Sequence, residues 1–388
     1  MPDGRPVGFR EAARIVAGFG LPAGPDPEPM VVAKNEWQTF VARVWGEKLT
    51  GLAIAASHGG ALPLSDERAE TLLERHRRAM AWCLRVEERL LTLDDRFSDA
   101  GIEYAVLKGP TIAHTAYPDP SLRGFGDLDV LVRGRDFKAA CSTLRQMGFG
   151  RIVPEPRRGF DERFGKAATH RHDGDSMEID LHRTLVLGPF GLWIKPEVLL
   201  DRAVPFGLGD RQIPRLDDTG MLLNVAMHAS LGWPPGLAPL RDVLQVSSAM
   251  AVDWAVLRSW AEAWRLSAVL HHAFATAESV LGAKATVDSR IFSDSRHRRS
   301  ESRALRTYLG ERHAVGGTAL STLRAIPGLR DKAAYMEALA FPQQEFMRGR
   351  YSKRSYGRRL LTPARWGLQR LLDRRHPQQQ VRFTPGGD

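Results

Sequence analysis

Two aspartates separated by one residue lie inside a short apolar run, Gly126-Asp127-Leu128-Asp129-Val130-Leu131-Val132. We interpret this run as a strand. Successive side chains of a strand face opposite ways, so Asp127 and Asp129 should share one face. The alternate residues Leu128, Val130 and Val132 should point into whatever covers the other face. The run therefore predicts a short strand that is apolar on one side and doubly acidic on the other.

Two carboxylates held side by side repel each other unless a cation, or a proton on one of them, relieves the repulsion. A third acid follows in Glu178-Ile179-Asp180-Leu181-His182, which also has the pattern of a strand. Hard oxygen ligands favour Mg²⁺, with Mn²⁺ as the second choice. The pattern indicates phosphoryl or nucleotidyl transfer, with Asp127, Asp129 and Asp180 as metal ligands and catalytic residues.

The residues around the acids alternate between strand and helix patterns. A strand over 102–107 is followed by a turn and a short helix over 111–117. After the acidic strand, a helix over 136–147 precedes strands over 151–153, 167–172 and 177–184. This order predicts a small mixed sheet with helices on one side.

Helical patterns flank this core, so the predicted fold class is α+β. The expected divisions, in chain order, are a flexible lead-in over 1–30, an N-terminal helical segment over 31–100, the core over 101–188, a helical C-terminal domain over 189–345, and a basic tail over 346–388. Within the flanks, helical periodicity runs over 34–58, over 65–98 and over 254–281. Ser65 is the expected N-cap of the second of these helices.

The turn before the short helix contains Lys108-Gly109-Pro110. A helix start exposes unpaired N–H groups, which suits a triphosphate. Gly109 would let phosphate approach the backbone, and Lys108 would neutralise a phosphate oxygen. Arg123 lies four residues before Asp127 and could clamp the same phosphate, although a structural ion pair to Asp127 or Asp119 is an alternative.

Composition sets the broad class of protein. The chain has 388 residues and only two cysteines, Cys83 and Cys141, which indicates a reduced cytoplasmic protein, with one disulfide as the alternative. No stretch approaches the roughly 20 apolar residues of a membrane span. Residues 346–388 contain eleven Lys and Arg but two acids, so most of the net charge of +10 lies there. This tail could be a solvated arm, or it could contact RNA or an anionic membrane.

These residues together resemble the nucleotidyltransferase superfamily of the DNA polymerase β type, and more closely its uncharacterised bacterial branch. The similarity rests on Leu107-Lys108-Gly109, Tyr117-Pro118, Arg123, the Asp127/Asp129 strand and Ile179-Asp180-Leu181-His182, and continues through Asn224-Val225-Ala226-Met227-His228 and Leu240-Arg241-Asp242. The wider superfamily has Gly-Ser or Gly-Gly where this chain has Lys108-Gly109. The resemblance implies metal ligation by the three aspartates and binding of nucleotide phosphates by the Lys108-Gly109 turn.

The expected function is Mg²⁺-dependent transfer of a nucleoside monophosphate from a nucleoside triphosphate to a hydroxyl. The acceptor stays open among a peptide, a protein, tRNA and a small molecule. Two alternatives remain: transfer of another group, such as a sugar, from a nucleotide-activated donor, and a non-catalytic nucleotide-binding regulator. The intact set of three acids argues against the regulator.

Overall fold

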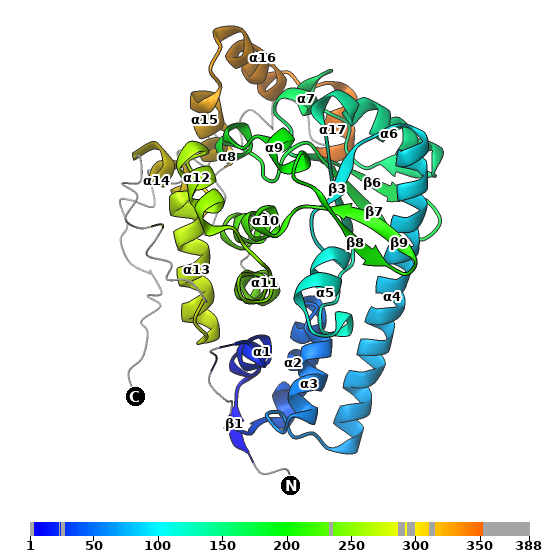
Figure 1. The fold of residues 1–388 in the computed structure, drawn as a ribbon, viewed down its shortest axis with the longest axis vertical. Coiled ribbons are helices and arrows are strands. Elements are labelled where there is room, and N and C mark those ends of the chain that lie inside the picture. Colours follow the sequence, from blue (N-terminus) through cyan, green and yellow to red (C-terminus); the bar gives the residue numbers. More distant parts are fainter. Residues whose placement is uncertain are drawn as a thin grey trace.

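The computed structural model describes residues 4–22, 24, 28–232, 236–285, 292, 299–309 and 315–351. They form an α+β fold with a central mixed sheet between helices (Figure 1), which confirms the predicted class. None of the helices in these ranges is both long and apolar enough to cross a bilayer. The basic tail, whose role stays a prediction, lies outside the described residues except for 346–351.

The N-terminal part is helical. Its elements are β1 (Arg5–Val7), α1 (Phe9–Gly18), β2 (Met30–Val32), η1 (Lys34–Glu36), α2 (Trp37–Gly46), α3 (Thr50–His58) and α4 (Asp66–Asp99). The sequence predicts a flexible lead-in over 1–30, but the structure places helix α1 there. Its apolar face, which includes Ala12 and Val16, is fully buried and packs on later helices of the chain. The six prolines of this segment therefore do not prevent a folded helix.

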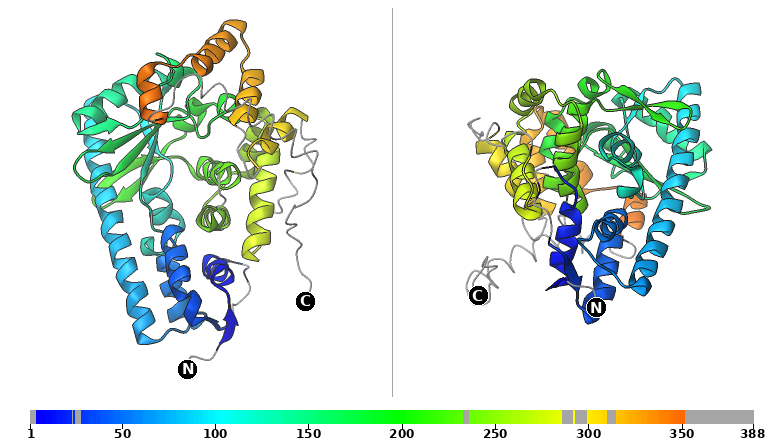
Figure 2. Two further views of the ribbon diagram at one scale, coloured as in Figure 1. Left: turned by 180° about the vertical axis from the view of Figure 1, so that it is seen from behind. Right: turned by 60° about the horizontal axis from the view of Figure 1, so that its bottom comes forward.

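Two features of the N-terminal helices position the site. The periodicity over 34–58 is split into α2 and α3, because Lys48 has a positive φ of 60° and ends α2. Helix α4 begins after Ser65, as expected, although the Ser65 side chain makes no cap hydrogen bond. It runs from the N-terminal helices past the whole sheet (Figures 1 and 2).

The sheet has seven strands in the order β5-β6-β7-β4-β3-β9-β8. Its strands and the helices between them are β3 (Tyr104–Val106), α5 (Pro110–Ala116), η2 (Pro120–Leu122), β4 (Leu128–Val132), η3 (Gly134–Asp136), α6 (Phe137–Gln146), β5 (Phe149–Arg151), α7 (Phe160–Arg163), β6 (Ala167–His172), β7 (Glu178–His182), α8 (Pro189–Trp193), α9 (Pro196–Leu200), β8 (Val204–Leu208) and β9 (Arg211–Arg215). The hairpin β8–β9 follows residue 189, where the sequence predicts mostly helix. The sheet thus continues beyond the residues expected to form the core.

The two faces of the sheet belong to two apolar cores. Leu128, Val130 and Val132 of β4 join Ile179 and Leu181 of β7 in a core covered by α4 and α6. The neighbouring Leu131 belongs instead to the large core shared with the C-terminal helices. The predicted alternation along β4 is therefore confirmed, and its acidic face looks toward the C-terminal helices.

The C-terminal helices are α10 (Asp218–Leu231), α11 (Leu237–Ala249), α12 (Trp254–Ala263), α13 (Ser267–Leu281), α14 (Arg299–Arg306), α15 (Val315–Ala325), α16 (Leu329–Ala340) and α17 (Gln344–Tyr351). The helix predicted over 254–281 is split into α12 and α13, and Arg265, between them, has a φ of 59°. Helices α10, α11 and α13 pack on one another and form the centre of the large core.

Gly51 provides a test of how the N-terminal helices meet the loop before β4. A Cβ atom at Gly51 would lie 2.2 Å from the Ser121 carbonyl oxygen, so α3 touches η2 backbone to backbone. We expect Gly51→Ala to lower the free energy of unfolding by about 2–3 kcal/mol, because rigid backbone must shift. Gly134→Ala, where a Cβ would meet nothing within 4 Å, is the matched control. Equal urea midpoints for the two variants would contradict this packing.

Candidate active site

Two of the three predicted acids, Asp129 and Asp180, come together on the adjacent strands β4 and β7. These strands are parallel and in register, with Asp129 directly opposite Asp180. Asp127 immediately precedes β4. Ligand atoms of Asp129, Asp180 and His182 all lie within 4.8 Å of one another, so these three side chains form a cluster that could hold a metal ion. The expected convergence of acids from two neighbouring strands is thus observed for Asp129 and Asp180, whereas Asp127 is not a member of this cluster.

Asp127 lies beside this cluster. Its carboxylate is about one-third exposed and contacts two lysines, whereas Asp129 is almost fully buried. Both aspartates contact the same ammonium group, that of Lys108, which confirms that they share one side of the strand. The third member of the cluster is His182, two residues after Asp180 on the same face.

Lys108 lies between Asp127 and Asp129. Its Nζ atom is 2.6 Å from Asp129 Oδ2 and 3.3 Å from Asp127 Oδ2. Burial alone would lower the lysine's pKa, but the two carboxylates outweigh it and raise the pKa above its ordinary value. Burial likewise opposes ionisation of the two acids, yet Lys108 keeps the pKa of Asp127 below its usual range, and that of Asp129 well below it. The site therefore has one ammonium and two ionised carboxylates in contact.

The conformation of Gly109 and a hydrogen bond from a C-terminal helix define the Lys108-Gly109 turn. Gly109 has φ 73° and ψ −114°, a conformation that favours glycine, and it precedes the first residue of α5. The Asn224 side chain of α10 donates a hydrogen bond to the Leu107 carbonyl, with a donor–acceptor distance of 2.7 Å. The C-terminal helices thus set the position of the turn.

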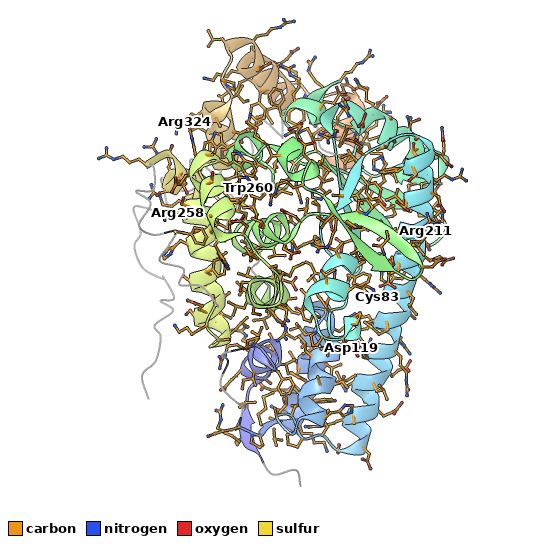
Figure 3. All side chains as sticks on the ribbon, in the orientation of Figure 1. Cys83, Asp119, Arg211, Arg258, Trp260 and Arg324 are labelled. Carbon is orange, nitrogen blue, oxygen red and sulfur yellow. The ribbon has the colours of Figure 1, made fainter. Side chains whose placement is uncertain are left out.

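Helix α4 holds the loop before the acidic strand. Trp82 Nε1 donates to the Gly126 carbonyl at 3.0 Å, and the Phe125 amide donates to Cys83 Sγ at 3.3 Å. Cys83, which Figure 3 places on α4, is buried, and burial raises the pKa of its thiol. Cys83 and Cys141 are both free thiols, so the alternative of a disulfide is wrong.

The donor set of the cluster fits a divalent cation. His182 Nδ1 lies 3.1 Å from the Thr184 carbonyl, which can only accept, so Nδ1 must carry a proton. Nε2 lies 3.0 Å from Asp129 Oδ1, which also accepts when ionised. Asp180 Oδ1 is buried and has no hydrogen-bond partner among the described residues. A proton or a metal ion between these atoms would satisfy them, and two carboxylates with one imidazole are common ligands of divalent metals.

Arg123, predicted as a phosphate clamp, is held by Asp242 of α11. Its Nε and Nη2 atoms lie 3.1 and 2.7 Å from the two carboxylate oxygens, and the Tyr117 hydroxyl donates to the same carboxylate at 2.9 Å. All three side chains are buried. Arg123 therefore does form a structural ion pair. Its partner is Asp242, not Asp127 or Asp119 as the alternative interpretation expected. Arg123 still borders the cavity described next, so nucleotide binding by Arg123 stays a prediction.

A cavity of about 320 Å³ opens beside Asp127 and Lys108. It lies between the sheet, the α2–α3 turn and the C-terminal helices, and its lining includes Glu47, Lys48, Gly109, Arg123, Phe125, His228, Ala238 and Pro239. His228 lines this cavity, and desolvation by the surrounding protein atoms, followed by the charge of Lys108, lowers its pKa to about 4. His228 is therefore neutral at physiological pH.

Lys48 and His228 were not predicted as site residues. Lys48 Nζ lies 3.3 Å from Asp127 Oδ1, although 79 residues separate the two in the chain. No local spacing could indicate this contact. The sequence did contain one signal for His228, because the segment Asn224 to His228 is among those that resemble the nucleotidyltransferases.

A family model described as "Uncharacterised nucleotidyltransferase" matches residues 33–282. This match spans most of the chain and includes all the site residues described above. The chain belongs to this family, and it is a nucleotidyltransferase. The comparison with curated proteins gives no match.

Two solved structures match part of this chain. One is the lincosamide antibiotic adenylyltransferase LnuA with lincomycin bound, 16% identical, with a TM-score of 0.30 over 42% of this chain and 97% of that chain. The other is an antigenic nucleotidyltransferase-like protein from Paracoccidioides brasiliensis, 16% identical, with a TM-score of 0.32 over 53% of this chain and 96% of that chain.

Proposed function

We propose that the protein transfers a nucleoside monophosphate from a nucleoside triphosphate to a hydroxyl group, with Mg²⁺ or Mn²⁺ as cofactor. The observation that carries the proposal is the in-register pairing of Asp129 with Asp180, which places two carboxylates and His182 within 4.8 Å of one another. Asp129, Asp180 and the adjacent Asp127 are the proposed metal ligands. Bound there, the ion would neutralise phosphate charge and lower the pKa of the acceptor hydroxyl.

The chain's own residues supply the other parts of the reaction. Lys108 is in contact with both Asp127 and Asp129, so its ammonium is within reach of phosphate oxygens at the same place. Gly109 has no side chain to hinder a phosphate that approaches the turn. Asp180, with one unpaired oxygen, is the proposed base that takes the proton of the acceptor hydroxyl.

Bond changes in this reaction balance as a substitution at phosphorus. The acceptor oxygen forms a bond to the α-phosphorus while the bond from that phosphorus to the bridging oxygen of pyrophosphate breaks. Pyrophosphate leaves with the electron pair of the broken bond, and Asp180 receives the hydroxyl proton. No step oxidises or reduces any group.

A transfer assay tests this function. The protein is incubated with each nucleoside triphosphate labelled at the α-phosphate, with Mg²⁺ or Mn²⁺, and with separate RNA, protein and small-molecule fractions of a cell extract. We expect label in one fraction together with release of pyrophosphate, and neither without the metal. Mass spectrometry of the product distinguishes an added nucleotide from an added sugar. Absence of both label and pyrophosphate with all four nucleotides would reject the proposal.

A further inference from the structure

Lys48 occupies a backbone position that does not require a lysine. It follows the end of α2, where the Lys48 amide donates to the Trp45 carbonyl at 3.0 Å and the Leu49 amide donates to the Val44 carbonyl at 2.8 Å. Helices that end in this pattern usually have glycine at the residue with positive φ. Here that residue is Lys48, whose φ is 60°. A glycine would be relaxed here, so the reason for the lysine lies in its side chain.

The Lys48 side chain lies along the loop that precedes β4. A Cβ atom at Gly126 would be 3.5 Å from Lys48 Nζ and 3.6 Å from its Cε, and a Cβ at Gly124 would be 3.6 Å from Lys48 Cβ. Because these two residues are glycines, the aliphatic part of the Lys48 side chain packs directly against the backbone of the loop. The ammonium reaches Asp127 Oδ1, while Lys108 faces Oδ2 of the same carboxylate.

Of Lys48, Lys108 and Arg123, the three cations that line the cavity, Lys48 is the one whose nearest carboxylate oxygen is farthest away. Lys108 Nζ is 2.6 Å from Asp129, and Arg123 Nη2 is 2.7 Å from Asp242. Lys48 is 3.3 Å from Asp127, which it shares with Lys108, and its side chain is 41% exposed. Of the three, Lys48 therefore has the charge that could most easily exchange its carboxylate for a phosphate.

The turn that carries Lys48 is held in place. Glu47 Oε2 accepts a hydrogen bond from the Leu237 amide at the start of α11, at 2.9 Å, and Glu47 Oε1 pairs with Arg43 at 2.7 Å. The lysine is thus fixed at its base to the C-terminal helices, which form the opposite wall of the cavity. Because the backbone of this turn is already held, less conformational entropy is lost when Lys48 binds a ligand.

We propose that Lys48 is a ligand for the triphosphate of the donor nucleotide, supplied by the α2–α3 turn to a site otherwise built from the sheet and α5. The inference rests on the proposed function. A divalent ion held by Asp127 would compete for the carboxylate oxygen that now contacts Lys48, and phosphate oxygens would take its place.

Binding of inorganic tripolyphosphate in the presence of Mg²⁺, measured by calorimetry on the full chain, tests the inference without any need to know the base or the acceptor. We expect Lys48→Met and Lys48→Gly to weaken binding about tenfold or more, the loss expected for one charge-assisted contact. Lys48→Arg should retain most of the affinity. Lys138→Met, at an exposed lysine of α6 paired with Glu162, is the matched control and should bind as wild type does.

Thermal melting separates ligand binding from a structural role. Lys48→Gly removes the positive-φ strain, so it should melt at the wild-type temperature or above it while it binds tripolyphosphate more weakly. In the transfer assay, both Lys48→Met and Lys48→Gly should raise KM for the nucleotide more than they lower kcat.

Two results would overturn the inference and leave the proposed function standing. One is wild-type affinity for tripolyphosphate in Lys48→Met. The other is a fall in melting temperature for Lys48→Gly that accompanies its loss of affinity, which would make the lysine a structural residue. Failure of the wild-type protein to bind tripolyphosphate or to release pyrophosphate would instead reject the proposed function, and the inference with it.

Discussion

Asp180→Asn should reduce nucleotidyl transfer about a thousandfold or more and leave the protein at least as stable as the wild type. The loss of activity follows from removing one proposed metal ligand and the proposed base. The stability follows from the surroundings of Asp180, because its Oδ1 is buried without a hydrogen-bond partner among the described residues and lies close to Asp129. An amide of the same shape removes the repulsion between the two carboxylates.

Asp129→Asn should abolish transfer equally but should also destabilise the fold. Asp129 is 2.6 Å from Lys108, so its loss leaves a largely buried ammonium with only the more distant Asp127. We expect the free energy of unfolding to fall by about 2–4 kcal/mol, somewhat less than for a fully buried pair. The two substitutions thus share an effect on activity and differ in stability.

Pyrophosphate release and urea unfolding measure these effects. Mn²⁺ should raise the melting temperature of the wild-type protein and should have a smaller effect on Asp180→Asn. Asp173→Asn, at an exposed aspartate in the turn between β6 and β7, is the control for changing one carboxylate of the same hairpin. Undiminished pyrophosphate release by Asp180→Asn would exclude its role in catalysis.

Asp242→Asn should lower the free energy of unfolding by about 3–5 kcal/mol, because it leaves the Arg123 guanidinium buried without its carboxylate. The same carboxylate accepts from Tyr117, so two side chains near the sheet lose their anchor on α11. The double variant Arg123→Met/Asp242→Leu should recover much of this loss, since apolar residues of similar size tolerate burial better than an unpaired charge.

Urea unfolding of the two single variants and the double variant forms a thermodynamic cycle. The comparison pair is Arg258 and Glu262 of α12, which lie 3.2 Å apart with more than half of each side chain exposed; Figure 3 labels Arg258 at the surface. Arg258→Met should cost no more than about 0.5 kcal/mol. A comparably small loss for Asp242→Asn would show that the buried pair is not a main support of the fold.

The parts of the fold that follow from local pattern could be predicted from the sequence. The alternation along β4 gave the correct side for each residue, and helix α4 appears where periodicity placed it. The breaks at Lys48 and Arg265 could not be predicted, since non-glycine residues rarely adopt positive φ.

Features that depend on distant contacts were also missed. The hairpin β8–β9 pairs Pro205 with Pro214, and proline usually argues against a strand unless the strand is near an edge, as this hairpin is. The partner of Arg123 lies 119 residues further along the chain. In the site, the order of acidic residues was sufficient to predict that Asp129 and Asp180 lie together, but nothing local indicated that Lys48 would contact Asp127.

The pairing of Asp129 with Asp180 makes the chemistry of this protein depend on strand alignment. Sliding β7 by one residue along β4 would turn Asp180 and His182 into the apolar layer beneath α4 and α6 and bring Ile179 and Leu181 to the polar side. A single inserted residue within either strand would therefore remove the site entirely, whereas a loop such as residues 152–159, between β5 and α7, could lengthen at less cost. Variation in length during evolution should accordingly accumulate in such loops and spare the two strands.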